Sequence, residues 1–390
     1  MRDIVRRIDA ATPPDRDRAV DALRGLAILG VVLGHWLVTA LVTDSGTLHG
    51  ASPLQYMPQL TPISWVFQTL AVFFLVGGQV GAKSYAVARA QGTTYPRWLG
   101  TRIARLFRPA AVLLLVWTVA VVVMLAAGVD WVTLYTLCKR VLSPLWFLLV
   151  FAGLTAATPL VAKLHPLWPL AVVLHIDLIR FGLHGPDWLS NVNVAAGWLV
   201  PYCLGAAWAR EGLHNRATGW TLLLGGAAVT TGLILWAGYP ASMVGVPGQQ
   251  ISNLDPPNLA SVTFGLAQCG AALLLLGPLR RVLARPAAWA AVALVNLSAM
   301  TIFLWHQTAM MAVTALGLLA GRPLPGLHTV PDSAVWVFAR LAWLPVFAVA
   351  LLICWAAFRT YEHGGARGGG RVGRVVRQGR PAPSELTRRV

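Results

Sequence analysis

AAVLLLVWTVAVVVMLAA, the stretch from Ala110 to Ala127, is continuously apolar and carries no charge. An α-helix rises about 1.5 Å per residue, so a stretch of this length crosses most of the ~30 Å hydrocarbon core of a bilayer. Similar apolar runs recur along the chain, without the alternation that a membrane-spanning strand would need. The sequence therefore predicts an all-α, polytopic integral membrane protein.

Composition supports the same class. The chain has 390 residues, of which 57% are hydrophobic and 12% are charged, against about 25% charged in soluble domains. Its net charge of +17 would suggest nucleic acid as the partner of a soluble protein. Here the basic residues gather in loops on one side, and no aromatic platform for bases accompanies them. The expected partner is the lipid bilayer, with no nucleic acid.

We predict about ten transmembrane helices in a multi-pass protein of the cytoplasmic membrane. Most Lys and Arg residues then lie in connections that share one side with both termini, so the positive-inside rule predicts cytoplasmic termini. The expected helices are 22–42, 61–82, 103–127, 144–162, 166–184, 192–209, 217–238, 259–279, 287–319 and 335–358.

The chain divides into three expected regions. Residues 1–20 form a cytoplasmic N-terminal segment, residues 21–358 form the transmembrane domain, and residues 359–390 form a Gly- and Arg-rich cytoplasmic tail that is expected to be disordered. The proline-containing outside segment 239–258 is a candidate lid over a site. The 4 cysteines show no metal-binding spacing, so we expect no metal.

The first helix carries ionisable residues, which are costly inside a membrane and therefore functional candidates. At about 100° per residue, Arg24 and His35 lie within about 20° of one helix face, about 16 Å apart along the axis. Asp21 precedes Arg24 by one turn and is placed to hold its guanidinium. The alternative is a snorkelling arginine and a packed core histidine.

A second basic group lies at the start of the third helix. Arg102 and Arg105 share a helix face, and Arg108 follows one turn later. Arginines at a membrane surface bind phosphate groups in bidentate fashion, which suits a phosphate-bearing cofactor. The alternative is ordinary positive-inside anchoring.

Two further groups are candidate substrate contacts. His306 falls toward the outer leaflet in the ninth helix, where it would orient an acceptor hydroxyl or serve as a hydrogen-bonded core histidine. Asp177 and Arg180 lie one turn apart in the fifth helix. They form either a structural ion pair or a substrate contact.

Several motifs resemble the acyltransferase 3 family of membrane-bound acyltransferases, in the same order along most of the chain. They are Asp21-Ala-Leu-Arg24-Gly25 followed by His35, Phe73-Phe74-Leu75-Val76-Gly77-Gly78, Arg102-Ile-Ala-Arg105, Pro144-Leu-Trp-Phe147 and Phe303-Leu-Trp-His306. One departure is that many members have Ser-Gly where this chain has Gly77-Gly78.

The resemblance implies transfer of an acyl group, often acetyl, from cytoplasmic acyl-CoA to a hydroxyl of a carbohydrate or of a glycosylated or lipid-linked acceptor. It implies that His35 is the catalytic histidine, Arg24 its essential partner, and Arg102 and Arg105 donor-binding residues, with Arg108 beside them. Whether His35 acts as a general base or as a transient acyl carrier stays open.

The main rival hypothesis is a multi-helix transporter or exporter of envelope glycan or lipid precursors, since buried His, Arg and Asp also suit a proton-coupled carrier. The chain has no second half that repeats the first, and its basic mouth adjoins the histidine-bearing helix, so an enzyme is favoured. The acceptor, the acyl chain length and the oligomeric state stay open.

Overall fold

The computed structural model describes residues 2–44, 46–211 and 215–362. Within these ranges it is mostly helical, with 9 helices long and apolar enough to cross a membrane, which confirms the predicted polytopic all-α class. The long helices are α2 (Arg18–Val38), α5 (Leu70–Ala90), α6 (Tyr95–Ala126), α7 (Trp131–Ala156), α10 (Val192–Glu211), α11 (Arg216–Trp236), α12 (Leu259–Leu283), α14 (Ala299–Gly317) and α15 (Ala334–Glu362).

Shorter elements connect the long helices. Residues 363–390, most of the predicted tail, lie outside the described residues. The connecting elements are α1 (Arg2–Ala10), strands β1 (Ala40–Asp44) and β2 (Thr47–Ala51), α3 (Pro53–Tyr56), η1 (Pro58–Leu60), α4 (Thr61–Ser64), η2 (Trp65–Phe67), α8 (Thr158–Val161), α9 (Leu167–Asp177), η3 (Leu178–Gly182), η4 (Asp187–Asn191), α13 (Pro286–Leu297) and η5 (Leu318–Ala320).

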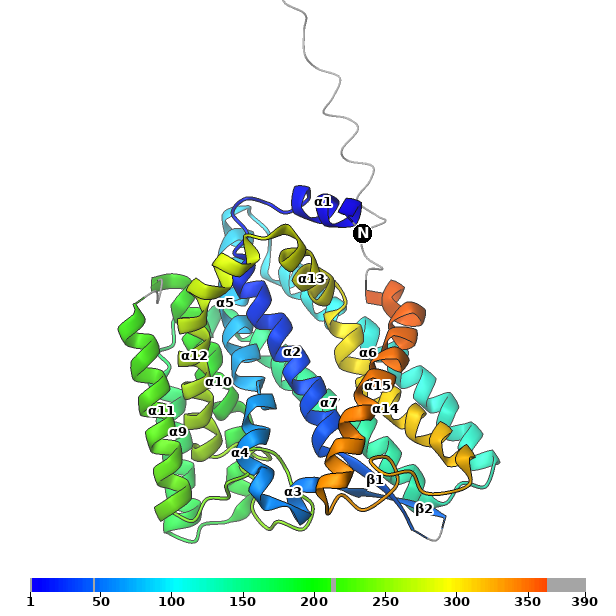
Figure 1. Cartoon of the computed structure of the whole chain (residues 1–390). Helices are drawn as coiled ribbons and strands as arrows, with labels where there is room; N and C mark the ends of the chain where they lie inside the picture. The colour runs from blue at the N-terminus through cyan, green and yellow to red at the C-terminus, as the bar shows by residue number, and fades with distance from the viewer. Residues whose placement is uncertain (1, 45, 212–214, 363–390) are drawn as a thin grey trace, which may run out of the picture.

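The helix predicted at 166–184 is α9 continued by the π-helical turn η3, and it is not among the 9 helices of the described residues that are long and apolar enough to cross a membrane. Its start follows the end of α7, where the Tyr95 hydroxyl of α6 donates to the Ala156 carbonyl at 2.7 Å. Its end meets the start of α12, where the Leu259 N–H donates to Asp177 at 2.6 Å. Figure 1 shows α1 and the last turn of α15 on the same side of the bundle. That this side is cytoplasmic stays a prediction.

The predicted helix 287–319 is broken at Ser298, whose φ of −110° and ψ of 8° are not helical. The Glu362 carboxylate at the end of α15 accepts hydrogen bonds from the Met300 N–H at 3.1 Å and the Thr301 N–H at 3.2 Å. An acidic side chain at a helix N-terminus satisfies its free N–H groups and complements its dipole. The break therefore lets α13 run in a different direction from α14 (Figure 1).

A β-hairpin, which the sequence patterns did not predict, follows α2 on the side of the bundle opposite α1 (Figure 1). β1 and β2 pair antiparallel, with Ala40 opposite Ala51. The segment from Pro53 to Phe67 then turns back in short helical pieces, so α5 begins at Leu70 and not at the predicted residue 61. We call this side the hairpin side and the opposite side the α1 side.

Close helix packing places α2 and α5 in the middle of the bundle. A Cβ on Gly78 of α5 would collide with the Tyr202 carbonyl of α10, and a Cβ on Gly205 would collide with the Leu75 carbonyl. Side chains at these two positions would separate the helices, so glycine permits the contact. α2 packs against α5, α12, α13 and α14, so its residues lie at the centre of the fold.

Arg340 of α15 anchors the hairpin end of α2. Its side chain is 1% exposed and donates to the Trp36 and Thr39 carbonyls at 2.6 Å each and to the Gly326 carbonyl at 2.8 Å. The last carbonyls of a helix have no partner within it, and a cation there complements the helix dipole. Arg340 therefore holds the helical turn that carries His35.

Candidate active site

A cavity of about 530 Å³ opens on the hairpin side. Its walls are the second half of α2, strand β2, the first half of α7 and the segment from Val244 to Asp255. The last segment belongs to the loop 239–258 that the sequence suggested as a lid, and the structure makes it one wall of the cavity. His35 lines the cavity from α2.

Neighbouring side chains of α14 hold the His35 ring. Its Nδ1 lies 2.7 Å from the amide nitrogen of Gln307, and its ring meets the His306 ring edge-on with centroids 5.1 Å apart. His306 is 0% exposed, and its Nδ1 lies 2.6 Å from the Phe303 carbonyl oxygen. The Trp36 indole N–H also donates to the His306 carbonyl at 3.0 Å. His35 therefore sits on a rigid support at the junction of α2 and α14.

Two buried polar atoms next to His35 lack hydrogen-bond partners among the described residues. They are His306 Nε2 and Gln307 Oε1. Buried polar atoms are nearly always paired, so atoms of this kind are expected where a bound molecule supplies the partner. The sequence motif includes His306, but the contact between Gln307 and His35 was not predicted.

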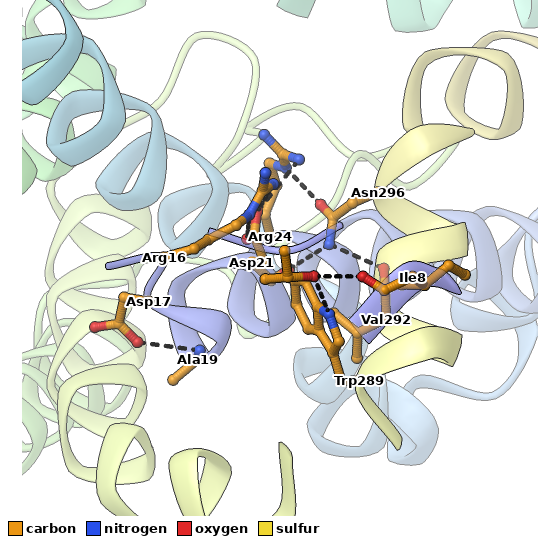
Figure 2. Close-up of polar contacts among 10 residues, drawn as sticks. Ile8, Arg16, Asp17, Ala19, Asp21, Arg24, Trp289, Val292 and Asn296 are labelled. Atoms are coloured by element: carbon orange, nitrogen blue, oxygen red, sulfur yellow. Dashed lines mark hydrogen bonds and ion pairs between the residues drawn. The ribbon is translucent and has the colours of Figure 1, made fainter. Parts of the chain in front are cut away.

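Arg24 lies near the other end of α2, on the α1 side. Its Nε donates to the Asn296 side-chain oxygen at 2.6 Å, and its guanidinium lies 3.5 Å from Asp21, the contact expected from their spacing (Figure 2). The Asn296 amide donates to the Asp21 carbonyl at 2.7 Å. Arg16 also pairs with Asp21 at 2.6 Å, and this hydrogen bond raises the pKa of Arg16. Arg24 is thus fixed from both α2 and α13.

The predicted basic group lies on the same side. Arg102 donates to the Ser84 hydroxyl of α5, and its guanidinium lies 5.1 Å from the Trp98 ring centroid. Arg105 and Arg108 are exposed. The charge of Arg105 acts on both Arg24 and Arg102, so the structure brings these arginines into one basic region. We call Arg24, Arg102, Arg105 and Arg108 the basic cluster.

Asp177 and Arg180 do not line the cavity. Arg180 forms an ion pair with Asp187 at 3.3 Å. The Asp177 carboxylate accepts hydrogen bonds from Asn193 at 3.0 Å and from the Tyr239 hydroxyl at 2.9 Å. Burial and the Asp177 charge raise the pKa of Tyr239, which keeps its hydroxyl protonated as a donor. These contacts tie α9 to α10 and to the loop after α11.

Lys139 and Arg140 of α7 line the cavity, and sequence reasoning did not select them. The signal was present, because both lie on the side that the positive-inside rule leaves poor in basic residues. A basic residue that breaks the topology rule needs a reason of its own.

A protein-family model matches nearly all of the described chain. Residues 17–359 match a family model described as an acyltransferase domain, from the N-cap residue of α2 to the last turn of α15. The chain belongs to the acyltransferase 3 family. No curated protein and no solved structure matches the chain.

The motifs of this membrane acyltransferase meet in space. Phe147 of α7 lies 5.1 Å from Phe74 of α5 and 5.4 Å from Phe303 of α14, measured between ring centroids. Phe147 and Phe303 also line the cavity. A Cβ on Gly77 would collide with the Phe151 ring, so Phe151 occupies the space of the serine found there in many members. The acyltransferase thus builds one aromatic cluster from three separate motifs, and two of them face the cavity.

Proposed function

We propose that this protein is an O-acyltransferase of the cytoplasmic membrane that moves an acyl group, most simply acetyl, from cytoplasmic acyl-CoA to a hydroxyl of a carbohydrate or of a glycosylated or lipid-linked acceptor. The observation that carries the proposal is the position of His35. It lines a cavity on the hairpin side, while Arg24 on the same helix lies in the basic cluster on the α1 side. Donor and acceptor then reach His35 from opposite sides.

The basic cluster suits the donor. Coenzyme A carries several phosphate groups at one end and the acyl thioester at the end of a long flexible arm. Arg24 and Arg102 are held in place by Asn296 and Ser84, so their guanidinium groups are oriented before a phosphate binds. A rise of about 1.5 Å per residue separates Arg24 from His35 by about 16 Å, a gap that the arm would span. Prior orientation lowers the entropic cost of binding.

The chemistry at His35 follows from its hydrogen bond to Gln307. We propose that in the reacting state the Gln307 amide is turned by 180°, so that its oxygen and not its nitrogen faces His35 Nδ1 and accepts the Nδ1 proton. His35 Nε2 then keeps a lone pair that accepts the proton of the acceptor hydroxyl. The oxygen then forms a C–O bond with the thioester carbon, the C–S bond breaks, and the imidazolium returns the proton to the departing thiolate. General base catalysis of this kind contributes typically about 10²–10⁴-fold in rate.

A covalent route through acyl-His35 is the alternative chemistry, and it uses the same nitrogen. His306 is fully buried beside His35 and is not itself a lining residue of the cavity, so in both routes we propose that it meets an acceptor group that reaches past His35 to His306 Nε2. Its unpartnered Nε2 and its ring contact with His35 support this role. We keep Asp177 and Arg180 out of the proposed site, because their contacts are with Asn193, Tyr239 and Asp187.

The test is an acyl-transfer assay with the full chain in lipid nanodiscs, radiolabelled acetyl-CoA and a glycolipid extract as acceptor. His35→Ala should lower product formation by about 10²-fold or more, and His306→Ala by less. His49→Ala is the matched control, because His49 is exposed on the hairpin. Wild-type transfer by His35→Ala would show that His35 only packs. Absence of label transfer by the wild type to any hydroxyl compound would overturn the proposed function itself.

A further inference from the structure

The cavity that holds His35 carries an excess of positive charge. Its charged lining residues are Lys139, Arg140 and Asp255. Resting on the proposed function, we infer that the acceptor is an anionic glycan or glycolipid, whose phosphate or carboxylate group binds Arg140 while a nearby hydroxyl lies beside His35. This names the chemical class of the acceptor and assigns Arg140 as a residue that determines it.

Arg140 lies in the cavity wall. It is partly buried, and a Cβ on Gly50 of β2 would contact its guanidinium, with Cζ at 3.3 Å and Nε at 3.5 Å. The glycine therefore lets the guanidinium lie against the hairpin backbone. A guanidinium braced in this way loses less entropy when it forms a bidentate pair with an anion.

The charge of Arg140 has no partner within the part of the chain that the structure describes. The ion pairs of that part are made by other arginines, and Arg140 makes neither a hydrogen bond nor an ion pair there. Partial burial of an unpaired charge is unfavourable, whereas burial of a paired one is tolerated. An anionic group of a ligand in the cavity would supply the missing partner.

The face of α7 around Arg140 suits a glycan. Thr136 and Ser143 lie one turn before and one turn after Arg140 and line the same cavity, so hydroxyl groups flank the guanidinium. Trp146 lines the cavity a further turn along and offers an aromatic surface to the apolar face of a sugar ring. Lys139 lies at the exposed edge, 5.9 Å from the Tyr135 ring centroid.

The position of Arg140 relative to His35 links binding to chemistry. Both residues line one cavity, and the charge of Arg140 acts on the His35 ring. An acceptor held at Arg140 by its anion would therefore have its adjacent hydroxyls within the space next to His35. A competing explanation is that Arg140 only tunes the electrostatics of His35, in which case acceptor charge would not matter.

Binding and transfer measured separately test the inference. The probes are methyl glucoside, methyl glucuronide and glucose 1-phosphate, titrated onto the full chain in phosphatidylcholine nanodiscs. The variants are Arg140→Gln, Arg140→Lys and Arg322→Gln. Arg322 is exposed in the loop after η5, so Arg322→Gln removes the same charge from the hairpin side without touching the cavity.

The wild type and Arg322→Gln should bind the two anionic probes at least about tenfold more tightly than methyl glucoside, as one charge-assisted pair allows. Arg140→Gln should lose this preference while its affinity for methyl glucoside and acetyl-CoA stays unchanged. Arg140→Lys should keep part of it, because the charge remains and the bidentate geometry is lost. Adding phosphatidylglycerol to the nanodiscs identifies the source: displacement of glucuronide indicates a lipid headgroup, and no displacement indicates a glycan group.

Equal affinity of the wild type for neutral and anionic probes overturns the inference. So does an anionic preference that survives in Arg140→Gln. The proposed function is judged by a different readout, the transfer of labelled acetyl. Acetyl transfer without a preference for anionic probes would support the proposed function and overturn the anionic acceptor. A preference for anionic probes without acetyl transfer would support the anionic ligand and overturn the proposed function.

Discussion

Arg340→Met is the perturbation that most directly tests how the fold supports the site. Methionine has a similar reach and keeps an apolar contact near Met310, whose sulfur lies 2.9 Å from the Arg340 guanidinium. It removes every donor that now serves the carbonyls of Trp36, Thr39 and Gly326. Those carbonyls are then left without the partner that the fold provides.

The magnitude follows from the number of partners. An unpaired buried acceptor costs about 1–3 kcal/mol, so loss of the partner of these carbonyls sums to about 3–9 kcal/mol. The substitution also removes the cost of burying a guanidinium at 1% exposure, which offsets part of that sum. We expect a net loss of about 3–5 kcal/mol in the free energy of unfolding, the lower part of that sum after the offset. Arg340→Lys should lose less, since an ammonium retains some of the donors.

The assay is unfolding of the purified chain in mixed micelles by added sodium dodecyl sulfate, followed by tryptophan fluorescence. Arg322→Met is the control, because the side chain is exposed and such changes cost within about 0.5 kcal/mol. Acyl transfer should also fall in Arg340→Met under conditions where the protein remains folded, since α2 carries His35 one turn from the anchored carbonyls. A free energy of unfolding within about 1 kcal/mol of the wild type would refute the reasoning.

Three further predictions concern the donor, the cap of α2 and the topology. The double variant Arg102→Ala, Arg105→Ala should weaken acetyl-CoA binding by about 1.5–3 kcal/mol per lost charged hydrogen bond in an equilibrium titration. The control Arg89→Ala, which changes an exposed residue of α5, should leave the affinity unchanged. Unchanged affinity in the double variant would show that Arg102 and Arg105 serve only as topology signals. Burial raises the pKa of Asp17, but its hydrogen bond and ion pair with Arg280 outweigh this and hold the pKa below 3.8. The stabilisation is therefore present above about pH 4 and is lost as pH falls through the lower folded pKa, a dependence that Asp17→Asn should abolish in unfolding measured against pH. A reporter active only in the cytoplasm should give signal when it is fused to either terminus, and a silent, folded fusion would show the reverse orientation.

Much of the α1 side of the candidate site could be predicted from sequence because it depends on spacing within single helices. Arg24 and His35 lie on one α-helix, and the contact between Asp21 and Arg24 follows from their separation by one turn. The helical periodicity applies wherever the helix packs. The grouping of Arg102 and Arg105 near Arg24 was expected from charge, and the structure brings them together.

The hairpin side of the candidate site could not be predicted in the same way, because its residues meet through tertiary packing. Gln307 reaches His35 from α14, and the Arg140 guanidinium rests on Gly50 of a hairpin that has no strong strand pattern in the sequence. The broken helix at Ser298 also escaped prediction. Its apolar pattern continues through the break, and the stabilising carboxylate comes from Glu362 in another helix.

The sequence by itself determined the class of this protein, because the hydrocarbon core of a bilayer admits only apolar helical segments of sufficient length. It also determined the family, since the motifs occur in order along residues 17–359. Only the tertiary structure decided which side chains surround His35 and that Asp177 and Arg180 lie away from the cavity. It also decided that Arg140 lies in the cavity wall without an ion-pair partner among the described residues. The physical reason is that membrane helices are selected individually by hydropathy, whereas their mutual contacts depend on glycine spacing, breaks and buried hydrogen bonds that connect distant segments.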